Sequence, residues 1–206
     1  MFIEVDGTIS GIDRARWTWP RTNTRMLRYF TSDPSDVNAA IELLPFVRGS
    51  CVQAGGCMGI WPLRLAQIYS TVYTFEPQPE SFHCLQANIL GVGNIRAFHA
   101  ALGDERGFVG MTHREDDNYG AAYVEPGATI EMQRIDDLGL DDCGLIYLDV
   151  EGYESKVIRG AVETIERCKP AIGVEVKFDA GVVPLLLSMG YRIHRRTNLD
   201  VILRAD

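Results

Sequence analysis

Four carboxylates, Glu76, Asp149, Glu151 and Glu175, stand at the ends of apolar runs that are rich in strand-forming residues. Carboxylates in such positions can take a proton from a hydroxyl, accept hydrogen bonds from a sugar or bind a cation. Each also has a plainer interpretation, because an acid after a strand often caps the next helix or pairs with Arg or Lys. They can act together only if the fold brings the ends of these runs to one place.

A glycine-rich turn, Ala54-Gly55-Gly56-Cys57-Met58-Gly59, follows another apolar run. Glycines let a ligand approach the backbone, and a following helix offers free amides and the positive end of its dipole. No Gly-Lys-Ser or Gly-Lys-Thr follows, so this is not a phosphate loop, and its Gly-Gly-x-x-Gly spacing departs from the dinucleotide fingerprint. Glu76, seventeen residues beyond Gly59, is well placed to accept both hydroxyls of a ribose.

Strand-like and helix-like segments alternate from residue 50 onwards. The expected strands are 51–54, 71–75, 95–99, 145–149, 171–176, 191–194 and 201–204. The expected helices are 60–69, 79–89, 153–167 and 181–189. Such alternation predicts an α/β fold with a mainly parallel sheet and helices on both faces. Ligands of such sheets bind beyond the carboxyl ends of the strands, which is where the carboxylates and glycines stand.

The remaining segments have weaker patterns. Residues 1–32 are expected to be irregular, because Thr, Gly, Asp and Arg interrupt each apolar run, and Asp33-Pro34-Ser35-Asp36 predicts a helix start. Segments near 107–112 and 120–124 are expected to form an excursion or hairpin with a polar tip at 114–118. The length favours one domain over 1–206, with an N-terminal strap and helix over 1–46 and the core over 50–206.

The N-terminal segment combines basic and aromatic residues that could bind an acceptor. They are Arg14, Arg16, Arg21, Arg25, Arg28, Trp17, Trp19, Tyr29 and Phe30. Aromatic rings stack on sugars, and Arg pairs with anions, so this segment is a candidate acceptor platform or the arm of a homo-oligomer. The alternative is an extended strap packed on the sheet.

Composition excludes several classes of protein. The chain is 46% apolar and 23% charged, which is typical of a soluble globular protein. Its net charge of −8 argues against nucleic acid as a partner. We expect no membrane segment, because no apolar stretch reaches the required length, and no signal peptide at the acidic start. No two of the five cysteines have the two-residue spacing of a zinc or redox motif, and their number is odd. This pattern indicates reduced thiols and a cytoplasmic location.

Two blocks of sequence carry a family resemblance. They are 52–59 with 72–79, Phe82, Leu85 and Asn88, and then 135–138 with 146–154, Gly160, Ala161, Lys169, Pro170 and Glu175. Over roughly residues 50 to 176, the chain resembles the FkbM-type methyltransferases. The resemblance implies a class I, Rossmann-like fold with a seven-stranded sheet whose last strand is antiparallel. It also implies S-adenosylmethionine as cofactor and S-adenosylhomocysteine as product.

The resemblance also implies roles for individual residues. Glycines 55, 56 and 59 would face the methionine part of the cofactor, Glu76 would hold the ribose, and Asp149 would stand near the sulfonium. The full implied cofactor set is Gln53, Ala54, Gly55, Gly56, Met58, Gly59, Glu76, Pro77, His99, Ala100, Ala101 and Asp149. Of these, His99, Ala100 and Ala101 would lie near the adenine.

The leading interpretation is O-methylation of a sugar, glycan or small natural product. Asp149, Glu151 and Glu175 are the candidate bases, with His99 and His113 less favoured, and we expect no obligatory metal. The alternative is a non-catalytic cofactor-binding or assembly protein, because Gln53 replaces the family's usual acid and Cys57 its usual Asn. A nicotinamide-dependent oxidoreductase is disfavoured by the glycine spacing, and a nucleic acid base methyltransferase by the lack of an Asn-Pro-Pro-Tyr-like motif.

Overall fold

The structure is a computed structural model of the 206-residue chain. It describes residues 2–9, 11–21, 23, 27, 49–113, 122–197 and 199–205. The predicted helix that begins at Asp33 and the polar tip at 114–118 lie outside the described residues.

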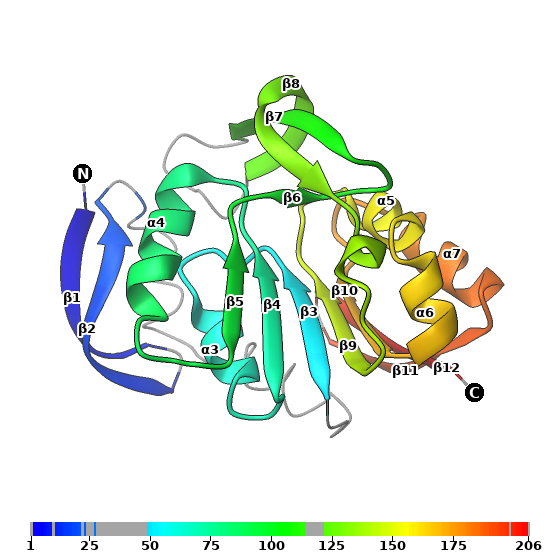
Figure 1. Cartoon of the computed structure of the whole chain (residues 1–206), viewed down its shortest axis with the longest axis horizontal. Helices are drawn as coiled ribbons and strands as arrows, with labels where there is room; N and C mark the ends of the chain where they lie inside the picture. The colour runs from blue at the N-terminus through cyan, green and yellow to red at the C-terminus, as the bar shows by residue number, and fades with distance from the viewer. Residues whose placement is uncertain are drawn as a thin grey trace.

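A seven-stranded sheet forms the centre of the molecule (Figure 1). Its strands are β3 Ser50–Ala54, β4 Thr71–Phe75, β5 Ile95–Phe98, β9 Cys143–Leu148, β10 Ala171–Glu175, β11 Tyr191–Arg196 and β12 Asp200–Ala205. The strand order is β11-β12-β10-β9-β3-β4-β5, and only β12 runs antiparallel to its neighbours, β10 and β11. The predicted fold class, including the antiparallel last strand, is confirmed.

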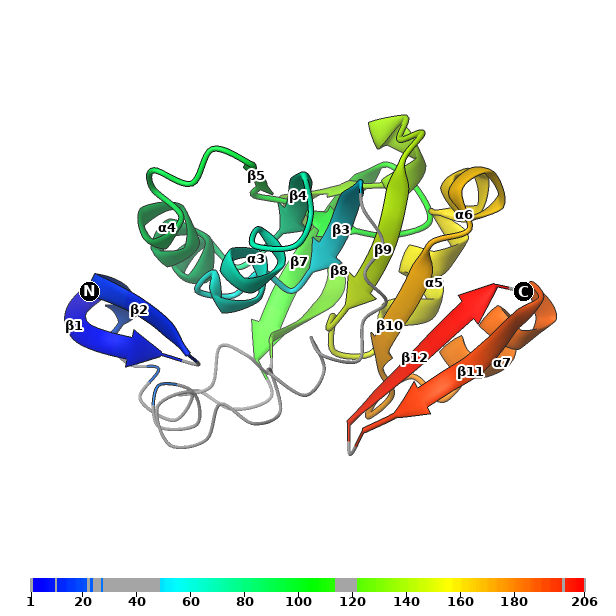
Figure 2. The same ribbon diagram turned by 90° about the horizontal axis from the view of Figure 1, so that it is seen from below.

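Helices cover both faces of this sheet, which explains why its central strands β3 and β9 are buried throughout. They are α3 Ile60–Leu65 and α4 Pro79–Asn88 towards one face, and α5 Glu154–Arg159, α6 Val162–Cys168 and α7 Val182–Ser188 towards the other (Figure 2). In β9, Leu145 and Tyr147 pack into the cluster that includes α3, whereas Ile146 and Leu148 pack with α5 and α6. All six residues of β9 are therefore buried.

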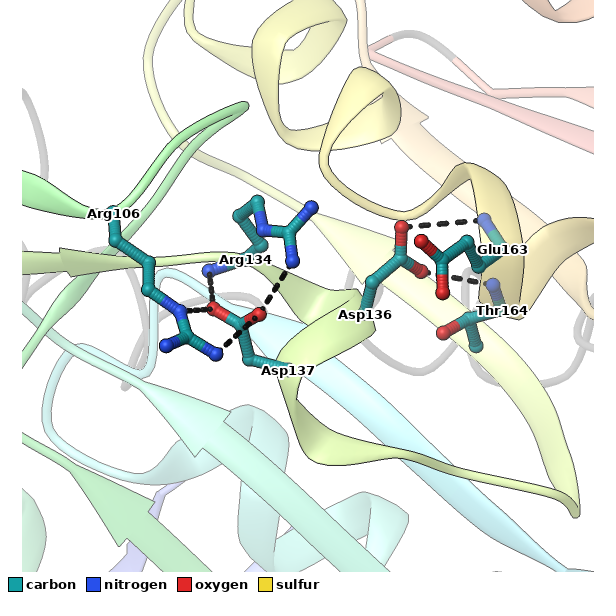
Figure 3. A network of polar contacts seen from close by, with 6 residues as sticks. All are labelled: Arg106, Arg134, Asp136, Asp137, Glu163 and Thr164. Carbon is teal, nitrogen blue, oxygen red and sulfur yellow. Dashed lines mark hydrogen bonds and ion pairs between the residues drawn. The ribbon is translucent and has the colours of Figure 1, made fainter.

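The prediction of a single helix over 153–167 is wrong, because the chain forms two helices that are separated at Gly160 and Ala161. A Cβ atom on Gly160 would overlap the carbonyl oxygen of Gly103, so this close approach is open only to glycine. The second helix, α6, receives its cap from a distant segment. The Asp136 carboxylate accepts hydrogen bonds from the amides of Glu163 (3.2 Å) and Thr164 (2.8 Å) (Figure 3).

The predicted excursion forms a hairpin. Its strands, β7 Gly107–His113 and β8 Ala122–Gln133, join β6 Ala101–Leu102 in a three-stranded sheet that rises above the carboxyl ends of the central strands (Figure 1). Asp137 anchors this hairpin at both ends. Its carboxylate accepts hydrogen bonds from Nε of Arg106 (2.8 Å), just before β7, and from Nη2 of Arg134 (2.7 Å), just after β8 (Figure 3). These guanidinium contacts, Arg106 first, lower the pKa of Asp137.

The prediction that residues 1–32 are irregular is wrong over residues 2–9 and 12–20. Strands β1 Phe2–Ile9 and β2 Ile12–Pro20 form an antiparallel hairpin that lies beside α4 in both views (Figures 1 and 2). Exposed Glu4 and Asp6 alternate with half-buried neighbours, which is the period of a half-buried strand. Trp17 and Trp19 are fully buried in the cluster with α3, so they do not belong to an exposed acceptor platform.

No helix among the described residues is both long and apolar enough to cross a membrane. All five cysteines are free, as expected for reduced thiols, and Cys51, Cys84 and Cys143 are buried.

Asn88, the last residue of α4, fastens the N-terminal hairpin to the core. Its Oδ1 accepts a hydrogen bond from the Thr18 amide (2.7 Å), and its Nδ2 donates to the carbonyl oxygens of Thr18 (2.9 Å) and Met58 (2.8 Å). Only 1% of Asn88 is exposed, so water does not replace these bonds. The side chain thus connects β2 to the glycine-rich turn.

Replacing Asn88 by Ala is expected to lower the free energy of unfolding by about 1 to 3 kcal/mol, because buried backbone groups lose their partner. Urea denaturation measures this change. Glu4→Ala is the control, since it removes only the exposed ion pair with Arg16 and should cost less than about 0.5 kcal/mol. Equal stability of the Asn88 variant and the wild type would contradict the assigned role.

Candidate active site

The glycine-rich turn packs directly against the end of β9. The amides of Gly55 and Gly56 both donate to the carbonyl oxygen of Phe75 (3.0 Å each), which folds the turn over β4. Gly55 has a φ of +84°, and a Cβ atom there would overlap the carbonyl oxygen of Asp149. Only glycine satisfies both conditions, so this residue sets how closely the turn approaches Asp149.

Glu76 closes the other side of the turn. Its Oε2 accepts a hydrogen bond from the Cys57 amide (2.6 Å), and its Oε1 accepts one from the Gln78 amide (2.8 Å). Only 6% of Glu76 is exposed, and burial raises its pKa to about 7 although the two amides act in the opposite direction. Cys57 itself has a φ of +46°, a conformation that Asn adopts more readily than most other residues.

Gln53 supports the turn from below. Its Nε2 donates to the carbonyl oxygens of Ala54 (3.1 Å) and Gly55 (2.9 Å), and its Oε1 accepts a bond from Thr74 Oγ1 (2.6 Å). The side chain is fully buried. A carboxylate could not donate to those carbonyl oxygens, so the amide at this position stabilises the turn in a way that an acid cannot.

A cleft of about 770 Å³, including the open space at its mouth, lies beyond the strand ends. Eight of the predicted site residues line it: Ala54, Gly55, Glu76, Pro77, Ala100, Ala101, Asp149 and Glu151. Sequence reasoning missed a set of apolar and aromatic lining residues: Trp61, Phe75, Leu102, Met111, Ala122, Tyr123, Val124, Val150 and Tyr153. Four of these come from the hairpin β7–β8, whose position over the cleft no local pattern reveals.

The other residues of the predicted cofactor set do not line the cleft, and His99 among them is exposed. Gly56 packs closely, since a Cβ there would lie 2.7 Å from Thr74 Oγ1, and Met58 is fully buried. Gly59 precedes α3 with a φ of +93°. His99 stacks on Phe82, with ring centroids 4.8 Å apart, and its Nε2 lies 3.1 Å from the carbonyl oxygen of Pro77.

Three carboxylates meet beside the cleft, and two of them, Asp149 and Glu151, line it. Oxygen atoms of Asp149, Glu151 and Glu175 all lie within 4.8 Å of one another, as their positions after β9 and β10 predict. Burial raises the pKa of Asp149 well above its usual range, and Glu175 and Glu151 add repulsion. Burial also raises the pKa of Glu175. Such a cluster retains or takes up a proton readily, and it could also bind a cation.

The cleft is therefore acidic. Among the described residues that line it, none is Lys, Arg or His, whereas Glu76, Asp149 and Glu151 all contribute carboxylates. A cation or a neutral polar ligand suits such a surface, and an anion does not.

Comparison with solved structures identifies the fold as that of the Rossmann-like methyltransferases. A Streptococcus mutans protein solved in complex with S-adenosylhomocysteine superposes with a TM-score of 0.53 at 10% identity, over 82% of this chain and 96% of that one. The methyltransferase FkbM of Methylobacillus flagellatus superposes with a TM-score of 0.52 at 18% identity, over 77% of this chain and 43% of that one. At such identities the likeness shows the fold alone.

Sequence comparison identifies the family. The methyltransferase FkbM domain matches residues 59–193, so the chain belongs to this family, whose cofactor is S-adenosylmethionine. The 2-O-methyltransferase NoeI of Sinorhizobium fredii is 25% identical over 122 residues, which cover 48% of this chain. The match covers 50% of that curated relative, so this chain spans about half of its length.

Gly55→Ala is expected to lower the free energy of unfolding by about 2 to 4 kcal/mol, from the left-handed conformation and from overlap with Asp149. Gly91→Ala is the matched control, because Gly91 has a similar φ of +86° with open space around it. The control should lose only about 1 to 2 kcal/mol. Equal losses in urea denaturation would show that the contact with Asp149 is not restrictive.

Proposed function

We propose that this chain transfers the methyl group of S-adenosylmethionine to a hydroxyl of a sugar or another neutral, polyhydroxylated acceptor. The observation that carries the proposal is the cluster of Asp149, Glu151 and Glu175 beside the glycine-rich turn. A hydroxyl must lose its proton as it is methylated, and a carboxylate with a raised pKa is suited to accept it. The relative named as a 2-O-methyltransferase supports the same chemistry.

The residues at the turn fit the cofactor. Gly55 lines the cleft beside Asp149, where its backbone would face the methionine part, and Glu76 offers its carboxylate to the ribose hydroxyls. Ala100 and Ala101, which are small and line the cleft, leave room for the adenine. When bound, S-adenosylmethionine supplies an electrophilic methyl group on a positively charged sulfur, and the acidic wall complements that charge.

Two tyrosines in the lining of the cleft fit the acceptor. Tyr123 and Tyr153 line it with aromatic surface on which a sugar ring can pack. The Asp149 cluster would then accept the proton of the acceptor hydroxyl, and the carboxylates of the cluster that remain ionised would disfavour phosphorylated or carboxylated acceptors.

The departures from the family pattern are compatible with this activity. Cys57 adopts the left-handed backbone and donates its amide to Glu76, and Gln53 braces the turn through two carbonyl oxygens. Because the turn closes with both residues in place, they give no support to a non-catalytic assembly protein.

The direct test is methyl transfer from tritium-labelled S-adenosylmethionine to a panel of neutral sugars, amino sugars and their oligosaccharides, with sugar phosphates and uronic acids beside them. We expect label in neutral or amino sugars and little in anionic ones. Asp149→Asn should reduce the rate by about 10²- to 10⁴-fold, the typical contribution of a general base. Transfer mainly to anionic acceptors, or an unaffected Asp149→Asn variant, would refute the proposal.

Glu76→Ala is expected to weaken cofactor binding by about 10- to 100-fold and to slow methyl transfer little at saturating cofactor, because charge-assisted hydrogen bonds to the ribose are lost. Titration calorimetry with S-adenosylhomocysteine measures this effect. Exposed Glu166→Ala is the control and should bind normally.

The same assignment predicts a pH dependence. With a pKa of about 7, Glu76 is mostly protonated at pH 6, so binding there must release a proton. Affinity for S-adenosylhomocysteine should therefore rise by up to about tenfold from pH 6 to pH 8 in the wild type, and this rise should be smaller in Glu76→Ala. Normal affinity of the variant would overturn the ribose assignment.

A further inference from the structure

The turn after β9 has an uncommon backbone at Glu151. This residue has a φ of +55°, and Gly152 follows with a φ of +103°. A left-handed conformation is ordinary for Gly but uncommon for Glu, so neighbouring contacts must hold it. In this conformation, Glu151 lines the cleft, and its carboxylate lies within 4.8 Å of carboxylate oxygens of Asp149 and Glu175.

Glu154 supplies contacts on both sides of Glu151. Its Oε1 accepts hydrogen bonds from the amides of Val150 (3.2 Å) and Gly152 (3.3 Å). Only 1% of Glu154 is exposed, and it does not line the cleft. Burial raises the pKa of Glu154, and the backbone amides act in the opposite direction. The amides of the turn therefore stabilise the ionised carboxylate, and the carboxylate holds the turn.

We propose that Glu154 is a positioning residue. Its carboxylate fixes the two amides that flank Glu151, and it thereby keeps the Glu151 carboxylate in the cluster with Asp149 and Glu175. The catalytic consequence rests on the proposed function, whereas the structural part does not. Because one oxygen accepts both bonds, a Gln side chain can keep them and an apolar side chain cannot.

A simpler role would be to support only the start of α5, where Glu154 is the first residue. Asp179 provides a control for that role. Its Oδ2 accepts a hydrogen bond from the Ser155 amide (2.7 Å) at the start of the same helix, and its Oδ1 accepts one from the Gly181 amide (2.9 Å). Asp179→Ala therefore weakens the helix start without removing the acceptor of the Val150 and Gly152 amides.

Amide hydrogen exchange, followed by NMR on the full chain, tests the structural part. Glu154→Met, which preserves volume, should speed exchange at Val150 and Gly152 by at least about tenfold. Glu154→Gln should stay within about threefold of the wild type, and Asp179→Ala should lose thermal stability but keep both amides protected. Protected amides in Glu154→Met, or equal exposure in Asp179→Ala, would overturn the proposal.

The catalytic part is tested with the labelled sugar panel and with S-adenosylhomocysteine as the binding probe. Glu154→Met should slow transfer by about 10- to 100-fold, as small displacements of reacting groups do, and leave the Kd of S-adenosylhomocysteine within about twofold. When Glu154→Met is combined with Glu151→Gln, the rate of transfer should fall no further than in Glu151→Gln alone, because both changes remove the contribution of the Glu151 carboxylate. Additive losses would show that Glu154 does not act through Glu151.

Failure of the proposed function has a different signature. If the wild type methylates no sugar of the panel, the methylation proposal fails. The exchange rates of Val150 and Gly152 then still decide whether Glu154 positions the turn.

Discussion

The candidate site depends on the parallel pairing of β3 with β9. This pairing brings the glycine-rich turn and the acidic turn to the same edge of the sheet, where the Asp149 amide donates to the carbonyl oxygen of Ala54 (3.1 Å). Gly55 then lies so close to the Asp149 carbonyl that no side chain fits between them. The distance between the proposed cofactor and the proposed base is thus a property of the backbone, held by two buried strands rather than by flexible side chains.

Electrostatics follows from this geometry. Burial raises the pKa of Asp149 and of Glu175, and repulsion from Glu175 and Glu151 adds to the rise at Asp149. The negative charge that the cluster retains favours a positively charged cofactor and a neutral acceptor. The Glu76 carboxylate, by contrast, accepts hydrogen bonds from the amides of Cys57 and Gln78, so Glu76 is arranged for binding and the Asp149 cluster for proton transfer.

Much of the fold was predictable because alternating strands and helices leave strong local signals. The acids at strand ends converge for the same reason, since parallel strands end at one edge. Other features arise from contacts between distant segments. The break at Gly160 depends on Gly103, the inward orientation of Gln53 depends on Thr74, and the hairpin β7–β8 contributes lining residues whose sequence pattern is that of any exposed strand. The hairpin β1–β2 is hard to predict because the polar residues that alternate with apolar ones in β1 also interrupt every apolar run.

The most direct test of this account is a crystal structure of the chain with S-adenosylhomocysteine. We expect the ligand to lie across the glycine-rich turn, with its ribose hydroxyls hydrogen-bonded to Glu76 and its sulfur facing the Asp149 cluster. A ligand bound elsewhere, or one whose sulfur faces away from Asp149, would contradict it.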